Sequence, residues 1–328
     1  MPVITNSMIH LDLQKKARAI KTAKTFSIKR TKLLKLLCRL LRGRHSRKMR
    51  YEQKHITRQD GTKLRICVYT PHKMKENVPG LLWIHGGGYS IGIPEQDDSY
   101  ILRFVEASGC VVVAPDYTLS IDKPYPAALE DCYAALLWLR DNGGSYGMCP
   151  EQIFIGGTSA GGGLAAAVSH YARDKAEIKL AFQILIYPML DDRLTESSTD
   201  NNAPVWNSVL NEASWRLYLG DLYGSSEIPV YAAAGRAENF TSLPPACLYV
   251  GTIEPFYDET MAYIDKLKAN NIPVHVKIFE GCFHGFDQLC ADTAVAKEAI
   301  AFLMESFNYA VKNYFAAQTQ TREENNVI

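Results

Sequence analysis

Short apolar runs alternate with helical stretches along most of this chain, and this alternation limits the fold more than any other feature. Six runs of five to seven residues read as buried strands, namely 80–84, 110–115, 152–156, 181–187, 246–251 and 274–279. Helical patterns occupy 99–106, 126–140, 160–173, 259–269 and 294–312. Strand and helix in alternation predict an α/β fold, a mostly parallel central sheet with helices on both faces.

Two β runs, 51–57 and 63–70, precede this alternation and are joined by the turn dipeptide Asp60-Gly61. They predict an antiparallel hairpin. The chain has 328 residues, of which 47% are hydrophobic, and this is enough to bury one large core. No fixed repeat and no run of about 18 apolar residues occurs, so the sequence argues against solenoid and membrane-spanning classes.

The cysteines have the pattern of reduced, buried thiols. There are eight, none in a C-x-x-C pair, and most lie within apolar runs such as 109–113. The N-terminal segment also lacks the continuous apolar stretch of a secretory signal. Both observations predict a cytoplasmic protein.

Charge is unevenly distributed along the chain. Residues 1–50 hold 15 Lys or Arg against one acid, Asp12, whereas residues 51–328 hold 21 against 34 acids, so the net charges are +14 and −13. In the basic arm, residues 8–42 read as one or two amphipathic helices. One face of this pattern collects Leu33, Leu36, Leu37, Leu40 and Leu41.

Two interpretations of the basic arm stay open. We favour the one in which the leucines pack onto the acidic body, because that body can neutralise the arm without an outside partner. The alternative is a contact with a membrane surface through residues 8–42. A nucleic-acid partner is not expected.

Residues 191–245 interrupt the alternation. This interval is polar, is rich in Trp and Tyr, and has one convincing helix at 208–219, which indicates an insertion over the strand ends. We therefore predict four parts in the chain. They are an N-terminal basic helical cap segment at 1–48, a core at 49–190 and 246–316, a cap insertion at 191–245 and a polar tail at 317–328.

Residues 157–163 read G-T-S-A-G-G-G and lie between a strand and an alanine-rich helix. The glycines permit a tight, strained turn that presents the Ser159 hydroxyl, and the amides at the helix start favour developing negative charge. A G-x-S-x-G run also occurs where a helix merely packs closely, but here both flanking elements are present. Ser159 is therefore the candidate nucleophile.

A second glycine-rich segment, H-G-G-G at residues 85–88, directly follows the run 80–84. Glycines expose backbone N–H groups, and hydrolysis of an acyl bond needs such donors where the carbonyl oxygen becomes an oxyanion. We assign Gly86 and Gly87, together with Ala160, to this oxyanion hole. His85 is interpreted as a structural residue that braces the glycine loop, since a better candidate base exists.

That base is His284, in the sequence G-C-F-H-G-F at 281–286, just after the run 274–279. Serine is a poor nucleophile at neutral pH and needs an imidazole to take its proton. A lone histidine is often a packing residue. The position of His284 after the last strand, in a glycine-flanked loop, favours the catalytic interpretation.

The acid that orients the imidazole should lie between the serine and the histidine in chain order. Residues 251–259, after the run 246–251, offer Glu254, Asp258 and Glu259. We favour Glu254, which is nearest the strand end. Asp258 and Glu259 are expected to cap the next helix.

Together these motifs resemble the hormone-sensitive lipase-like branch of the α/β-hydrolases, in which H-G-G-G supplies the oxyanion hole and G-[DT]-S-A-G-G the nucleophile. The similarity runs from about residue 50 to about residue 316. Four further segments match: D-Y at 116–117, Y-P-A-A-L-E-D at 125–131, Y-P-M-L-D at 187–191 and L-P-P at 243–245.

Two positions depart from the pattern of this family. Glu254 stands where Asp is usual, and a longer carboxylate can serve if the backbone sits further back. Residues 116–122 read D-Y-T-L-S-I-D instead of the common D-Y-R-L-A-P-E. The second departure removes an arginine that normally helps to brace the site.

The resemblance implies an α/β-hydrolase fold with a helical cap, and it implies no metal and no cofactor. It further implies a serine carboxylesterase that hydrolyses short-chain, small-molecule esters through an acyl-enzyme, with Ser159, His284 and Glu254 as the triad. An amide or formamide hydrolase similar to arylformamidases remains an alternative, as does, less favoured, a non-catalytic ligand-binding protein. A homodimer through the last strand and helix is also implied.

Overall fold

The fold is built on one eight-stranded sheet, described by a computed structural model that covers residues 3–20, 24–58 and 60–318. The strands are β1 (Arg50–Thr57), β2 (Lys63–Thr70), β3 (Val78–Ile84), β4 (Val111–Pro115), β5 (Met148–Thr158), β6 (Phe182–Ile186), β7 (Ala246–Gly251) and β8 (Val274–Phe279). Their order is β1-β2-β4-β3-β5-β6-β7-β8. The pairs β1–β2 and β2–β4 are antiparallel and the others are parallel, so the predicted hairpin and mostly parallel sheet are confirmed.

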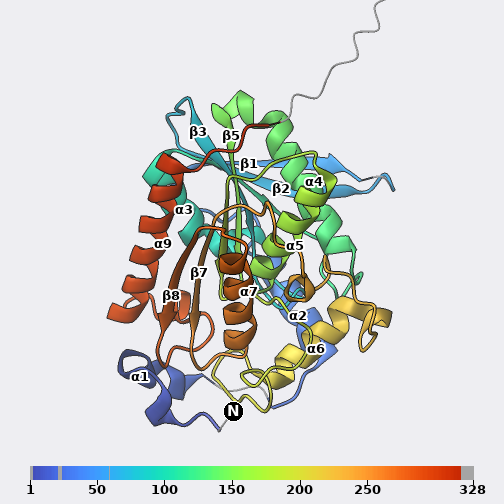
Figure 1. Ribbon diagram of the computed structural model, residues 1–328, viewed down its shortest axis with the longest axis vertical. Helices are drawn as coiled ribbons and strands as arrows, with labels where there is room; N and C mark the ends of the chain where they lie inside the picture. Colours follow the sequence, from blue (N-terminus) through green and yellow to red (C-terminus); the bar gives the residue numbers. More distant parts are fainter. Residues whose placement is uncertain (1–2, 21–23, 59, 319–328) are drawn as a thin grey trace, which may run out of the picture.

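Helices cover both faces of this sheet. They are α1 (Leu11–Ala19), α2 (Ile28–Arg39), α3 (Asp98–Ser108), α4 (Ala127–Asn142), α5 (Ala160–Lys175), α6 (Ser208–Leu219), α7 (Tyr257–Ala269), α8 (Phe286–Leu289) and α9 (Ala294–Asn313). In Figure 1, α3 and α9 lie on one side of the sheet and α4 and α5 on the other. Side chains alternate between the two faces of a strand, so β3 contributes to the hydrophobic core on each side of the sheet. Leu82 and Ile84 pack in one core, and Leu81 and Trp83 pack in the other.

The boundaries predicted from the sequence agree closely with this structure, except at β5. This strand begins at Met148, four residues before the predicted start at 152, because Met148 pairs with Val78 across a register shift. Pro150 and Glu151, within this additional part of β5, are exposed, so the segment lacks the continuous apolar pattern of a buried strand.

The basic arm forms two helices that differ in how they meet the body. α1 is packed: Leu13 and Ala17 are buried, and the His10 amide donates to the Gly281 carbonyl at 2.8 Å. The prediction over 8–42 also includes residues 21–23, which lie outside the described part of the chain. In Figure 1, α1, α2 and α6 gather at the end of the molecule where the described chain begins.

The favoured prediction for the leucines of α2 is wrong. All five, from Leu33 to Leu41, are exposed, and the buried residue of this helix is Thr31. The polar face of this segment is held against the body instead: Lys35 of α2 and Arg42, just after it, form ion pairs with Asp122 and Asp116 of the loop after β4. The backbone amides of Gly43 and Ser46 also donate to Glu95 and Asp98. The leucines are consequently directed to solvent.

Residues 191–245 contain α6 and the short 3₁₀ helices Gly220–Leu222 and Ala234–Arg236, with the predicted helix at 208–219 confirmed. Three other 3₁₀ helices are Asn6–Met8, Pro94–Asp97 and Gly143–Tyr146. The division into cap segments and core stays a prediction. Of the predicted tail at 317–328, residues 319–328 lie outside the described part of the chain.

Candidate active site

Ser159 sits on a strained turn between β5 and α5. Its φ of 56° and ψ of −122° lie in a region that L residues rarely adopt. The flanking glycines make this turn sterically feasible: a Cβ at Gly157 would lie 2.4 Å from the Ile84 carbonyl oxygen, and one at Gly161 would lie 2.0 Å from it. The turn is held by the Ser159 amide, which donates to the Ile186 carbonyl at 2.9 Å.

Three side chains that are distant in sequence meet at the C-terminal ends of the strands. Ser159 Oγ lies 2.9 Å from His284 Nε2, and His284 Nδ1 lies 2.5 Å from Glu254 Oε2. All three residues are buried, and Glu254 is 0% exposed. In this line the imidazole can take the hydroxyl proton while the carboxylate fixes the ring and stabilises its protonated form.

The backbone positions Glu254 for this contact. Its second carboxylate oxygen, Oε1, accepts a hydrogen bond from the Gly251 amide at 2.8 Å, so the side chain folds back over the end of β7. This anchoring lets the longer carboxylate reach the imidazole from its position directly after the strand.

The two rival acids lie in the first turn of α7, as expected, but the expectation that they cap this helix by a hydrogen bond is wrong. Asp258 accepts a hydrogen bond from the Ser197 amide at 2.6 Å, and Glu259 accepts one from the Leu190 amide at 2.6 Å. No side chain caps the start of α7. Both carboxylates are instead used to hold residues 190–197 against the core, and burial raises the pKa of Glu259 well above its usual range.

The glycine loop lies beside the serine. A Cβ at Gly86 would lie 2.9 Å from the Thr158 carbonyl oxygen and 3.2 Å from Ser159 Cβ. Gly87 has a φ of +123°, and a Cβ there would lie 2.1 Å from the Ile91 carbonyl oxygen. Side chains are therefore excluded at both positions, and Ala160 approaches the same place as the first residue of α5.

His85 contacts the loop itself. The ring is 1% exposed, stacks on Tyr117 at 4.3 Å between centroids, and its Nδ1 lies 2.8 Å from the Gly86 carbonyl oxygen. Burial lowers its pKa to about 4, although the bond to Gly86 opposes this shift. A neutral ring whose Nδ1 donates to Gly86 fixes the start of the glycine loop.

The arginine missing from the loop after β4 is replaced from another part of the chain. Arg58, at the turn between β1 and β2, binds Asp131 through two hydrogen bonds of 2.6 and 2.8 Å. It also donates to Thr118 Oγ1 at 3.2 Å, and Thr118 donates its amide to the same Asp131 at 2.8 Å. An arginine distant in sequence thus braces the loop in which Thr118 stands.

Sequence reasoning missed the support behind His284. Tyr187 packs edge-on against the His284 ring at 4.6 Å and donates its hydroxyl to Asp287 at 3.0 Å. The hydroxyls of Tyr100 and Tyr249 also donate to Asp287, which is buried. Only a weak indication of these supporting residues was present in the sequence. Asp287 follows His284 by three residues, and Tyr187 is the first residue of the Y-P-M-L-D segment that matches the family.

Aromatic side chains narrow the space around the triad. Phe256 lies 5.1 Å and Trp206 6.1 Å from the His284 ring, between centroids. A Cβ at Gly88 would lie 2.3 Å from the Trp206 ring and 2.8 Å from Ser214 Oγ. Trp206 and Ser214, both within residues 191–245, therefore lie directly against the glycine loop.

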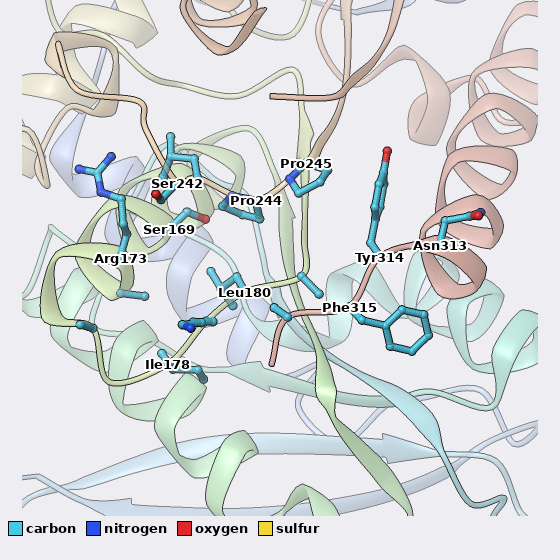
Figure 2. A pocket seen from close by; sticks show the side chains of 16 residues that line it. Ser169, Arg173, Ile178, Leu180, Ser242, Pro244, Pro245, Asn313, Tyr314 and Phe315 are labelled. Carbon is cyan, nitrogen blue, oxygen red and sulfur yellow. The ribbon is translucent and has the colours of Figure 1, made fainter. Parts of the chain in front are cut away.

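A separate hollow lies away from this site. Figure 2 shows the hollow, of about 360 Å³, lined in part by Ile178, Leu180, Pro244 and Phe315. These residues precede β6 and β7 or follow α9, whereas the triad residues follow strand ends. Since parallel strands share one C-terminal edge, the hollow lies at the opposite edge of the sheet and takes no part in the triad.

Metal-ligand clusters are also absent from the described ranges. Within residues 3–20, 24–58 and 60–318, no group of three or more His, Cys, Asp or Glu side chains is arranged to hold a metal ion.

Comparisons with known proteins agree with this geometry. A family model described as alpha/beta hydrolase fold matches residues 81–288. The chain belongs to this family. Esterase LipI of Mycobacterium tuberculosis is 33% identical over 223 residues, 67% of this chain and 69% of the relative. The arylesterase of Saccharolobus solfataricus is 31% identical over 236 residues, 68% and 72% of the two chains.

Solved structures lead to the same family. A structure titled as a bacterial heroin esterase superposes with a TM-score of 0.86 at 31% identity and covers 94% of this chain and 99% of that one. The predicted α/β-hydrolase fold, and the resemblance to the hormone-sensitive lipase-like esterases, are thereby confirmed.

Proposed function

We propose that this member of the α/β-hydrolase family is a serine carboxylesterase. The observation that carries the proposal is the continuous contact from Ser159 Oγ through His284 to Glu254, in a chain whose named relatives are esterases. Ser159 attacks the ester carbonyl carbon while His284 Nε2 takes its proton. Glu254 orients the ring and stabilises the imidazolium.

The oxyanion of the tetrahedral intermediate is received by the amides of Gly86, Gly87 and Ala160. The proposal is supported by the closeness of Gly86 to Ser159, since a Cβ added at Gly86 would lie 3.2 Å from Ser159 Cβ, and by the position of Ala160 at the start of α5. His284 then gives its proton to the leaving alcohol, and the acyl group remains on Ser159. Water, activated by the same imidazole, hydrolyses this acyl-enzyme.

The substrates are small-molecule esters with short acyl chains. This is supported by the aromatic rings around His284 and by Trp206, which lies against Gly88 and limits the depth of the site. A long acyl chain would have to displace the Trp206 ring. Residues 1–48 and 191–245 form the cap that encloses the substrate.

Hydrolysis of p-nitrophenyl esters over a series of acyl lengths tests this assignment. We expect kcat/KM to be highest for the short chains, and Trp206→Ala to move the optimum toward longer ones. Tyr223→Ala, at an aromatic residue in the same insertion, is the matched control and should leave the optimum in place. A maximum at long chains in the unchanged protein would contradict the proposal.

Two assays separate the alternatives. Parallel rates on ester and N-formyl substrates distinguish an esterase from a formamide hydrolase, and we expect the ester to react faster. A fluorophosphonate probe should label Ser159 covalently, because it reports an activated serine. A folded protein that resists the probe would favour a non-catalytic ligand-binding role.

We place this enzyme in the cytoplasm, and this is supported by its eight free cysteines, six of them buried. Within the described residues, no helix combines the length and apolar character needed to cross a membrane. The enzyme also forms a homodimer through β8 and α9. This is supported by β8 being the last strand in the sheet order, with residues that are mostly half-buried. Light scattering after gel filtration tests the dimer.

A further inference from the structure

α2 is amphipathic, but its apolar face is directed to solvent. Six leucines contribute to this face, namely Leu33, Leu34, Leu36, Leu37, Leu40 and Leu41, and their exposed fractions range from 38% to 70%. Ile28, at the start of the helix, is 50% exposed. Soluble proteins rarely leave a contiguous apolar surface of this kind without a partner.

The outward direction of these leucines is fixed by contacts on the opposite face. Thr31 is buried, and Lys35 and Arg42 form ion pairs with Asp122 and Asp116. Directly after the helix, the Gly43 amide donates to Glu95 at 2.8 Å and the Ser46 amide donates to Asp98 at 3.0 Å. Rotating the helix to bury its leucines would break these contacts.

Positive charge surrounds the leucines. Between residues 13 and 51 the chain has no Asp or Glu. Lys29, Arg30, Lys32 and Arg44 form no ion pair with any carboxylate in the described part of the chain, although the body carries a net charge of −13. These cations are therefore available to a negatively charged partner.

We propose that α2 binds the surface of an anionic lipid bilayer. The leucines enter the boundary between headgroups and acyl chains, and the free cations contact lipid phosphates and carboxylates. A nucleic acid fits less well, because it would leave the leucines in water. A second copy of this leucine-rich face fits less well, because four unpaired cations would face four others.

Sedimentation with vesicles tests this inference on the full chain. We expect binding to vesicles of equal parts phosphatidylserine and phosphatidylcholine, and little binding to phosphatidylcholine alone. Added salt should weaken the binding, and replacing Lys29, Arg30 and Lys32 by Gln should lower the partition coefficient roughly 100-fold, at about fivefold for each cation.

The apolar part is tested by changing Leu33, Leu37 and Leu40 together. Serine at all three should abolish sedimentation, whereas methionine at all three should retain it. A matched control places serine at three exposed apolar positions elsewhere, Leu11, Met74 and Leu194, and should bind as the unchanged protein does. Thermal unfolding checks that every variant is folded. Because neither this check nor the sedimentation assay measures ester hydrolysis, the test of vesicle binding does not depend on the esterase assignment.

Four outcomes would overturn the inference. One is equal binding to neutral and anionic vesicles, and another is sedimentation that the serine variant leaves unchanged. The third is an absence of vesicle binding together with a dimer that the serine variant converts to a monomer, which would assign the leucines to a second copy. Binding to duplex DNA in place of vesicles would likewise reject the proposal.

Discussion

The catalytic centre and α2 use similar groups in opposite ways. At the triad, Ser159, His284 and Glu254 are buried, and each hydrogen-bonds to the next. On α2, the apolar side chains are exposed and several cations are unpaired. In the first region the polar side chains find their partners within the chain. In the second, the leucines and cations would find theirs only on a bound partner. We therefore expect substitutions at the triad to act on chemistry and substitutions on α2 to act on association.

The largest effect is expected for Ser159→Ala. Removing the nucleophile should lower kcat on a short p-nitrophenyl ester on the order of 10⁶-fold, because the remaining groups supply only binding and oxyanion contacts. Ser169→Ala, a buried serine further along α5, is the matched control and should keep normal kcat. Residual turnover within a hundredfold of the unchanged protein would rule out the assigned nucleophile.

The next effect is expected for Glu254→Gln. The amide cannot stabilise an imidazolium and does not hold the same ring tautomer, so kcat should fall by about 10⁴-fold. Asp258→Asn is the matched control, because Asp258 follows the same strand but bonds to Ser197, and kcat should change less than about threefold. If the two variants behaved in the reverse way, Asp258 would be the triad acid.

The buried His85 makes the region of the catalytic centre sensitive to acid. Its pKa is lowered to about 4 in the folded protein, against about 6.5 when unfolded, so the unfolded state binds more protons between these values. This contribution is complete above pH 6.5 and is lost as the pH falls toward 4. It amounts to about 3 kcal/mol of unfolding free energy.

Urea unfolding over this pH range measures the effect of His85. His85→Asn retains a donor for the Gly86 carbonyl and removes the titration, so the dependence of unfolding free energy on pH should become shallower. His55→Asn, at an exposed histidine, should leave the dependence unchanged. Identical curves for His85→Asn and the unchanged protein would show that this ring is not the source.

The smallest effect is expected on α2. Leu37→Ala should change the unfolding free energy by less than about 0.5 kcal/mol, because Leu37 is 49% exposed and contributes little to the core. Leu185→Ala, in the buried strand β6, should cost about 2–5 kcal/mol. Chemical denaturation of both variants measures this contrast. A cost at Leu37 close to that at Leu185 would mean that the helix is buried in solution.

Much of the candidate site was predictable because its signals are local. The glycines around Ser159 and the glycines at 86–88 are needed where the backbone turns or where another chain segment approaches within about 3 Å, and such needs leave motifs. The alternation of strand and helix places the ends of β5, β7 and β8 at one edge, so chain order suffices to nominate Glu254 and His284.

The supporting residues were not predictable, because their partners come from distant segments. Arg58 substitutes for an arginine missing from the loop at Thr118, yet 60 residues separate the two. Asp287 collects hydroxyls from Tyr100, Tyr187 and Tyr249, which lie on different elements. Asp258 and Glu259 lie in the first turn of a helix but accept hydrogen bonds from the distant backbone amides of Ser197 and Leu190.

The sequence by itself determined the sheet and the strained serine turn, and it nominated the three candidate side chains of the triad, because backbone sterics and apolar periodicity act over short distances. The tertiary structure alone decided which face of α2 meets the body. Periodicity defines an apolar face but not its direction, and in the folded chain it is the polar face that contacts the loop after β4, through two ion pairs. That choice depends on where distant carboxylates lie once the chain has folded.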